Sequence, residues 1–367
     1  MKLKNSINVN TVSVGATPLL PISQALLGQS SNEWSDGFPS LSGDVTRWKF
    51  GGLTNEEMSA MTTPQVADKF GKGRFLEFKN LAWAGMSGVG GYTYNFNSFI
   101  LKDSVIKPTD VKGDSFRMIG TGNDGNVLVF LNYSDSADWR IRITGMKEGD
   151  RCSIGNANKS SEHIIVSKDG TYTFQKQYAA TSPNGIWYKS SQEVDVLVEQ
   201  LPLYPGAIVF DGVDDFGVCG NFPILTKEKG YTVVALRQYL DHGTDQIRAL
   251  ITNAPNSIVS RSTVTFELVG SDKSKANFSF GRGKSVKDFE PNALSYMTST
   301  SYNGQTITPG DYTESFERLL VGGFSENGKY GCNAAIWELV FLDHDATPEE
   351  LAKIESYFII NYPFLFN

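Results

Sequence analysis

The sequence contains few cysteines, which argues against a disulfide-stapled protein and against a cysteine-based metal site. Its 367 residues include only Cys152, Cys219 and Cys332. An odd number of widely spaced cysteines provides neither a disulfide framework nor a Cys-x-x-Cys metal site. We therefore expect three reduced, partly buried thiols. Such thiols favour a protein assembled in the cytoplasm over one matured in an oxidising compartment.

Basic residues and long apolar runs are also scarce. The 33 Lys and Arg are outnumbered by 40 Asp and Glu, and the formal net charge is −7. Binding nucleic acid requires a basic stripe, so no nucleic-acid partner is expected. No segment approaches the roughly 18 consecutive apolar residues of a membrane span. The first residues lack the compact apolar core of a secretion signal, so residues 1–44 are expected to form a retained N-terminal arm without a membrane partner.

Aromatic residues (12%) and 36 glycines are abundant, which favours strands joined by tight turns. Short alternating segments recur along residues 45–94, 95–202 and 203–367, with turn sequences between them. One helix is expected near the C-terminus. Thr347 suits its N-cap, Pro348 its first position and Glu350 the third position of a capping box. This pattern predicts an all-β protein with one short helix.

Two motifs carry a family resemblance. The first is the turn Phe210–Gly217, with the sequence FDGVDDFG. The second is the strand Ala335–Asp343 followed by the capped helix Pro348–Tyr357. Together they resemble the concanavalin-A/laminin-G-like superfamily, in which a short helix after the last strand packs on the edge of a jelly-roll sandwich. The resemblance implies the same fold for residues 203–367.

A looser resemblance concerns residues 45–94, which look like the first strands of such a jelly roll. The loop Asp68–Gly73 departs from the family pattern. On this interpretation residues 95–202 are a smaller β-sandwich inserted into the main one. The whole arrangement resembles structural proteins of tailed phages that infect Bacteroidales. That likeness implies a fibre or decoration subunit of the virion, assembled in the host cytoplasm.

The main enzymatic candidate is the segment Glu193, Asp195 and Glu199. Sandwich glycosidases place two glutamates and an aspartate on one strand face, commonly as E-x-D-x-E. Here Leu197 stands where the second glutamate should fall. We therefore expect a strand with inward valines and a charged outer face, and no enzymatic activity.

Three aspartates could bind a metal. Asp211, Asp214 and Asp215 cluster in sequence, and hard cations such as Ca²⁺ prefer oxygen ligands. The spacing is not that of an EF-hand, and Asp-Gly turns also arise for backbone reasons alone. Calcium is therefore the one cofactor left open, and no other is expected. The three histidines share no metal-ligand or nucleophile spacing.

Aromatic side chains are the most natural ligand-binding groups, because flat sugar faces stack on them. Trp187 and Tyr188 follow the turn sequence Pro183-Asn184-Gly185, so at least one should be exposed. Tyr302, followed by Asn303-Gly304, is expected in a loop that faces a ligand. The alternative is that these aromatics fill cores and interfaces.

These observations favour a non-enzymatic virion protein that contacts other virion proteins through its N-terminal arm. A homotrimer is expected, and the sandwich could also contact a host surface glycan. Two alternatives stay open. One is a secreted carbohydrate-binding module of a gut bacterium, which should carry a secretion signal. The other is a diverged glycoside hydrolase, which should lose activity when Glu193 and Glu199 are replaced.

Overall fold

The chain forms two compact units, described here from a computed structural model. One unit contains residues 1–50, 63–80 and 210–367, and the other contains 51–62 and 81–209. The structure describes residues 13–14, 17–18, 36–81, 87–98, 100–101, 105–121, 125–131, 139–156, 163–174, 184–222, 229–240, 248–253, 264–269, 274–280, 285–288, 292–308, 318–323 and 331–366.

Two eight-stranded sheets make up the larger sandwich. The first has the spatial order β26 (Gln305–Thr306), β25 (Ser301–Tyr302), β24 (Asn292–Met297), β19 (Thr232–Tyr239), β28 (Asn333–Leu342), β17 (Ile208–Asp211) and β6 (Gly88–Val89), and β3 (Val45–Lys49) also pairs with β28. The second has the order β23 (Ser285–Asp288), β22 (Lys275–Phe280), β21 (Val264–Val269), β20 (Arg248–Thr252), β27 (Leu319–Val321), β18 (Phe216–Cys219), β5 (Phe75–Lys79) and β4 (Gln65–Ala67).

Side chains from the two sheets meet in one core. The rings of Phe78 on β5 and Phe210 on β17 lie 6.1 Å apart, as do those of Phe266 on β21 and Tyr302 on β25. Such face-to-face contact between antiparallel sheets defines a sandwich. The expected fold class is confirmed: an all-β jelly-roll sandwich with an inserted smaller sandwich and one short C-terminal helix.

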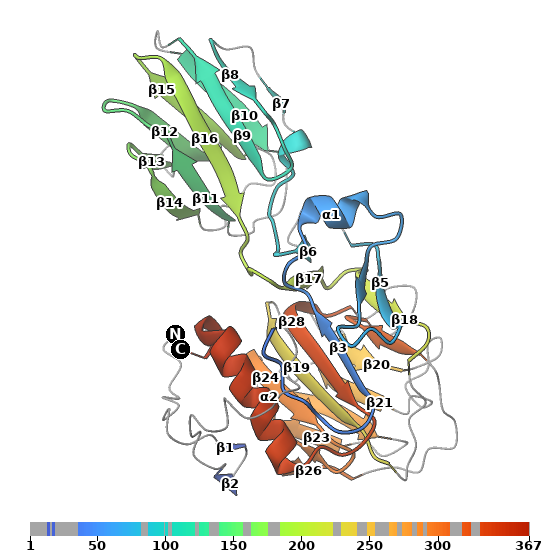
Figure 1. Cartoon of the computed structure of the whole chain (residues 1–367). Coiled ribbons are helices and arrows are strands. Elements are labelled where there is room, and N and C mark those ends of the chain that lie inside the picture. The colour runs from blue at the N-terminus through green and yellow to red at the C-terminus, as the bar shows by residue number, and fades with distance from the viewer. Residues whose placement is uncertain are drawn as a thin grey trace. The chain divides into compact units, whose positions relative to one another are not determined.

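That helix, α2 (Pro348–Asn361), runs across the sheet that contains β28, β19 and β24 (Figure 1). The expected capping box is present, because Thr347 accepts from the Glu350 N–H and Glu350 accepts from the Thr347 N–H. Its buried face includes Ile354, Tyr357 and Phe358. Tyr357 also donates to Glu338 of β28 at 2.9 Å.

Outside the two sandwiches, the described residues also form the short elements β1 (Ser13–Val14), β2 (Thr17–Pro18), α1 (Asn55–Ala60), η2 (Phe96–Ser98) and η5 (Pro363–Leu365). Within the described residues, neither helix is both long and apolar enough to cross a membrane. All three cysteines are buried and unpaired. Burial raises the pKa of Cys152 and Cys332 to about 12, so both are neutral thiols at physiological pH.

Two five-stranded sheets form the smaller sandwich. One has the order β13 (Ile164–Val166), β12 (Arg151–Asn156), β15 (Asn184–Ser190), β10 (Gly125–Leu131) and β7 (Ile100–Leu101). The other has the order β14 (Gly170–Phe174), β11 (Trp139–Thr144), β16 (Val194–Leu201), β9 (Ser115–Gly120) and β8 (Ile106–Thr109).

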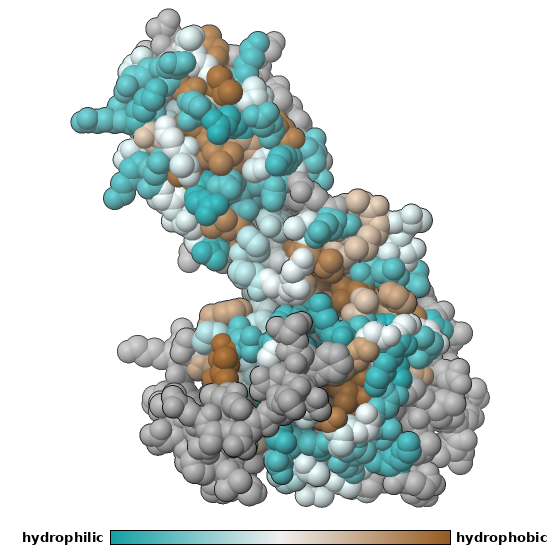
Figure 2. Space-filling view, viewed as in Figure 1, coloured by the Kyte–Doolittle hydropathy of each residue, from teal (hydrophilic) through white to brown (hydrophobic). Residues whose placement is uncertain are grey.

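The smaller sandwich has a core of its own. Among the described residues, fifteen buried side chains make up this core, including Phe116, Ile141, Ile154 and Val196. On the side shown in Figure 2, its apolar residues lie scattered among hydrophilic ones. The core explains the alternating pattern of strands such as β9 and β16, in which every second side chain enters it.

Candidate functional site

A hollow of about 410 Å³ lies on the larger sandwich, over β5 and β18 of the second sheet. Within the antiparallel pair of strands, Phe216 is opposite Lys79 and Val218 is opposite Glu77. Directly opposed residues share a sheet face, so these four side chains lie together. The hollow is lined by Glu77, Lys79, Asn80, Phe216, Val218 and Arg318.

The hollow combines an apolar floor with a charged rim. Phe216 is only 4% exposed, and Val218 is half-buried. Glu77 and Lys79 are exposed, and their Oε2 and Nζ atoms lie 3.4 Å apart. Burial lowers the pKa of the half-buried Arg318 from its ordinary range. The rim therefore offers a cation, an anion and an amide around an apolar surface.

The three aspartates lie beside this hollow. Their carboxylate oxygens come within 4.8 Å of one another, in the turn between β17 and β18. The Asn80 side chain donates to the Asp214 carbonyl at 3.1 Å and links the turn to the end of β5. Asp211, Asp214 and Asp215, which are close in sequence, are therefore also close in space.

The carboxylates fit a calcium ion only in part. Asp215 Oδ2 accepts from the Asp211 N–H at 2.9 Å, and Asp211 Oδ1 accepts from the Val213 N–H at 2.7 Å. These bonds are what an Asp-Gly turn needs for its own backbone. The Arg248 guanidinium also lies against Gly212, with Nη1 2.9 Å from the place of a Cβ. A neighbouring cation disfavours a metal ion, and calcium stays an untested prediction.

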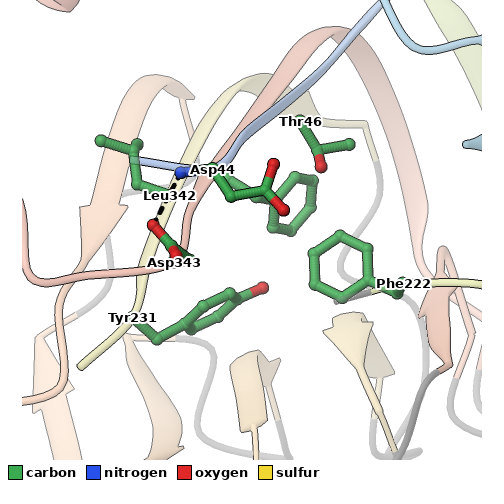
Figure 3. Close-up of a pocket in the computed structure, with 7 residues that line it drawn as sticks. Asp44, Thr46, Phe222, Tyr231, Leu342 and Asp343 are labelled. Atoms are coloured by element: carbon green, nitrogen blue, oxygen red, sulfur yellow. Dashed lines mark hydrogen bonds between the residues drawn. The ribbon is translucent and has the colours of Figure 1, made fainter. Parts of the chain in front are cut away.

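A second depression, at the end of the first sheet, is too narrow to bind a ligand. It is lined by Asp44, Thr46, Phe222, Tyr231, Phe341, Leu342 and Asp343. Figure 3 shows the Tyr231 and Phe222 rings close together, with Asp44 and Thr46 at the rim. The space has no room for a water molecule. The hydrogen bond from the Asp44 N–H to Asp343 Oδ1, at 2.8 Å, holds the rim in place.

Next to this rim lies a Ser-His-Asp arrangement that the sequence did not suggest. His344 Nε2 is 3.4 Å from Ser42 Oγ, and His344 Nδ1 is 3.3 Å from Asp343 Oδ1. Ser42 Oγ, however, donates to Glu350 Oε1 at 2.6 Å. A nucleophilic serine must give its proton to the histidine, and here the carboxylate receives it. The cluster instead ties residues 42–44 to the N-terminus of α2.

This cluster should make the larger sandwich sensitive to acid. Burial opposes ionisation of Glu350, but bonds from Ser42, the Thr347 N–H and His344 outweigh it and lower its pKa from 4.5 to about 2. Because its pKa is lowered in the folded state, ionised Glu350 stabilises the fold. This contribution to the free energy of unfolding is complete above pH 4.5 and is lost as the pH falls through about 2. We expect Glu350→Gln to remove about 1–2 kcal/mol at pH 7 and to flatten this acid-induced loss.

Urea unfolding of both proteins at pH 7, 4 and 2.5 measures this effect. Glu349→Gln is the matched control, because the Glu349 side chain is 73% exposed and pairs with Lys353 of the same helix. Its stability curve should follow that of the unmodified protein. An equal acid-induced loss in Glu350→Gln and the unmodified protein would contradict the assignment.

In the glycosidase-like segment, Asp195 and Glu199 lie on the outer face of β16, and Glu193 immediately precedes the strand. Val194, Val196 and Val198 are buried, as expected. Asp195 pairs with Arg117, and Glu199 binds Arg142 through two hydrogen bonds of 2.8 and 3.0 Å. Both carboxylates are paired with arginines at the surface of the sheet. This arrangement does not match the shielded acid and nucleophile of a glycosidase.

Trp187 and Tyr188 point to opposite faces of β15. Trp187 is half-buried, and its ring stacks on His163 at 4.4 Å and 17°. Tyr188 is fully buried and donates to Asp150 Oδ2 at 2.5 Å. The expectation that Tyr188 binds a ligand is therefore corrected: successive strand residues alternate between core and surface, and Tyr188 is on the core side.

The expectation that Tyr302 lies in a loop and faces a ligand is also corrected. It lies on β25 and is 0% exposed, with its ring stacked on Phe278 at 3.8 Å. Its hydroxyl donates to Glu267 Oε1 at 3.1 Å. The turn that follows it, at Asn303 and Gly304, is at the surface, but the tyrosine itself completes the core.

The solved structures compared with this chain are distant from it in sequence. No family model and no curated protein matches the chain. The sialidase of Trypanosoma rangeli is similar over 81% of this chain and 68% of its own, at 8% identity and a TM-score of 0.31. The tandem CBM22 domains of Paenibacillus barcinonensis Xyn10C are similar over 68% of this chain and 94% of their own, at 7% identity and a TM-score of 0.18. Similarity at this level carries no argument about function.

The residues of the hollow were not found from the sequence. Because side chains alternate between the two faces of a strand, the sequence Phe75–Lys79 does indicate that Glu77 and Lys79 share an outer face. Nothing local indicates that β5 pairs with β18, or that Arg318 lies beside them. Register between distant strands comes from the packing of the whole sandwich.

Proposed function

We propose that the protein is a non-enzymatic binding protein whose larger sandwich holds a carbohydrate in the hollow over β5 and β18. The observation that carries this proposal is the hollow's combination of volume and lining. About 410 Å³ is in the range of small-ligand sites. A sugar presents apolar C–H faces and many hydroxyls, which match Phe216 and Val218 below and the polar groups of the rim.

The same lining argues against hydrolysis as the function. Among the described residues that line the hollow, Glu77 alone carries a carboxylate, and the carboxylates of Asp211 and Asp215 beside the hollow accept hydrogen bonds from backbone N–H groups of their own turn. Glycoside hydrolysis usually requires two carboxyl groups on either side of the bond to be broken. The lining therefore supports binding of the ligand in preference to its cleavage.

Glycan-array screening followed by calorimetry on the full chain tests this proposal. We expect saturable binding to at least one glycan, and about a tenfold or greater loss of affinity in the double variant Lys79→Gln/Arg318→Gln. Lys69→Gln is a matched control, because Lys69 is an exposed cation on the same unit outside the hollow. The absence of glycan binding, or binding that the double variant retains in full, would overturn the proposal.

The role in a virion remains a separate prediction. The attachment of residues 1–44 to other virion proteins, the homotrimer and the location in a phage particle rest on the sequence resemblance alone. Mass spectrometry of purified particles and light scattering of the purified protein check them directly. A stable monomer that never occurs in particles would contradict the virion role and leave glycan binding unaffected.

A further inference from the structure

We propose that the ligand of the hollow is a neutral, extended chain of β-1,4-linked sugars, which runs along β5 and stacks on Phe75 outside the hollow. This inference rests on the proposed function, because the hollow holds the first sugars of the chain. Leu76 and Phe78 of β5 are buried in the core. Phe75, Glu77 and Lys79, which alternate with them, are exposed and therefore share the outer face of the sheet.

The ring of Phe75 is accessible to a ligand. Phe75 is 42% exposed, and its partner on β4 is Ala67, whose side chain is a single methyl group. On its other side, the pairing of β5 with β18 covers only Glu77 to Lys79, so no paired residue of β18 lies beside it. Within the part of the chain that the structure describes, no other ring stacks on that of Phe75. A sugar can therefore stack there without displacing another aromatic side chain.

Polar side chains lie between Phe75 and the hollow. Gln65 of β4 is directly opposite Glu77, so its amide and the Glu77 carboxylate are on the same sheet face. Glu77 and Lys79 carry opposite charges, with the Oε2 and Nζ atoms 3.4 Å apart. Because these two charges compensate each other, the row along β5 favours the hydroxyls of a neutral sugar over a charged sugar.

The length of this row indicates the length and shape of the ligand. From Phe75 to Lys79 an extended strand covers about 14 Å. One sugar ring is much shorter, so it cannot stack on Phe75 while it occupies the hollow. A chain of β-1,4-linked glucose is nearly straight, as the strand is, and its equatorial hydroxyls leave apolar C–H groups on both faces of each ring. An α-1,4-linked chain curls and would leave the row.

Calorimetry on the full chain, with cellobiose, cellohexaose and maltohexaose as probes, tests this proposal. We expect cellohexaose to bind about tenfold or more tightly than either of the other two. Phe75→Ala should weaken the binding of cellohexaose about threefold to tenfold, because the stacking contact is lost, and should leave that of cellobiose unchanged. Lys79→Gln/Arg318→Gln should weaken the binding of both cello-oligosaccharides, since both occupy the hollow.

Phe364→Ala is the matched control, because Phe364 is 54% exposed and its ring lies against Trp337 of the other sheet. This variant, and Phe75→Tyr, which keeps the ring, should bind cellohexaose as the unmodified protein does. Three results would each overturn the extended chain: no binding of cellohexaose, equal binding of cellohexaose and maltohexaose, or full binding of cellohexaose by Phe75→Ala. If another glycan still binds and Lys79→Gln/Arg318→Gln weakens it, the hollow remains a carbohydrate site and only its extension along β5 fails.

Discussion

Glu267→Gln is expected to destabilise the larger sandwich by about 3–5 kcal/mol. Glu267 and Arg237 are both 0% exposed, and their two hydrogen bonds are 2.5 and 2.9 Å long. Loss of the carboxylate charge leaves the Arg237 guanidinium in the core without its counter-ion. Burial alone would lower the pKa of Arg237, but Glu267 raises it above the ordinary value, so the arginine cannot escape by deprotonation.

The position of Glu267 also indicates how strongly the fold requires it. Its φ of +56° is a left-handed conformation that costs a non-glycine residue about 1–2 kcal/mol. It lies where the pairing of β21 with β22 shifts register between Thr265 and Leu268. Such an irregularity turns a strand residue toward the other face, and here it directs a carboxylate at Arg237 on the opposite sheet.

Urea unfolding monitored by circular dichroism measures the effect. The matched control is Glu77→Gln, an exposed carboxylate on the same sheet, for which a change below about 0.5 kcal/mol is expected. Replacing both partners, as Arg237→Met/Glu267→Leu, should recover much of the lost stability because neither charge is then buried. A single variant within about 1 kcal/mol of the unmodified protein would contradict this account.

Glu338→Gln is expected to cost about 3 kcal/mol and to loosen α2. The Glu338 side chain is 0% exposed under the helix. It accepts from Arg47 Nε at 2.8 Å, from the Tyr357 hydroxyl at 2.9 Å and from the Tyr362 hydroxyl. One buried carboxylate thus joins β3, β28 and the C-terminal helix, and removal of its charge leaves Arg47 without its buried partner.

Hydrogen exchange distinguishes this local effect from general destabilisation. Amides of α2 should lose protection in Glu338→Gln more than those of β19, which lies in the same sheet. Glu349→Gln, an exposed position on the same helix, serves as the control. Equal loss of protection in α2 and β19 would indicate that Glu338 stabilises the sandwich as a whole and has no special role in attaching the helix.

The sequence by itself determined the parts of this protein that depend on neighbouring residues. The capping box of Thr347 and Glu350 spans one turn of helix, and the alternation Val194–Val196–Val198 lies on one strand. Both patterns act over a few residues, so local chemistry is sufficient to predict them. The turn that gathers Asp211, Asp214 and Asp215 is local in the same way.

Only the tertiary structure decided which strands became neighbours and which aromatics were buried. Tyr188 and Tyr302 have the same flanking turn signals as an exposed residue, yet each hydroxyl has a buried carboxylate as its partner. The hollow brings together β5, β18 and Arg318 from distant parts of the chain. Pairing between distant strands is set by the burial of whole sheet faces, and no short stretch of sequence contains that information.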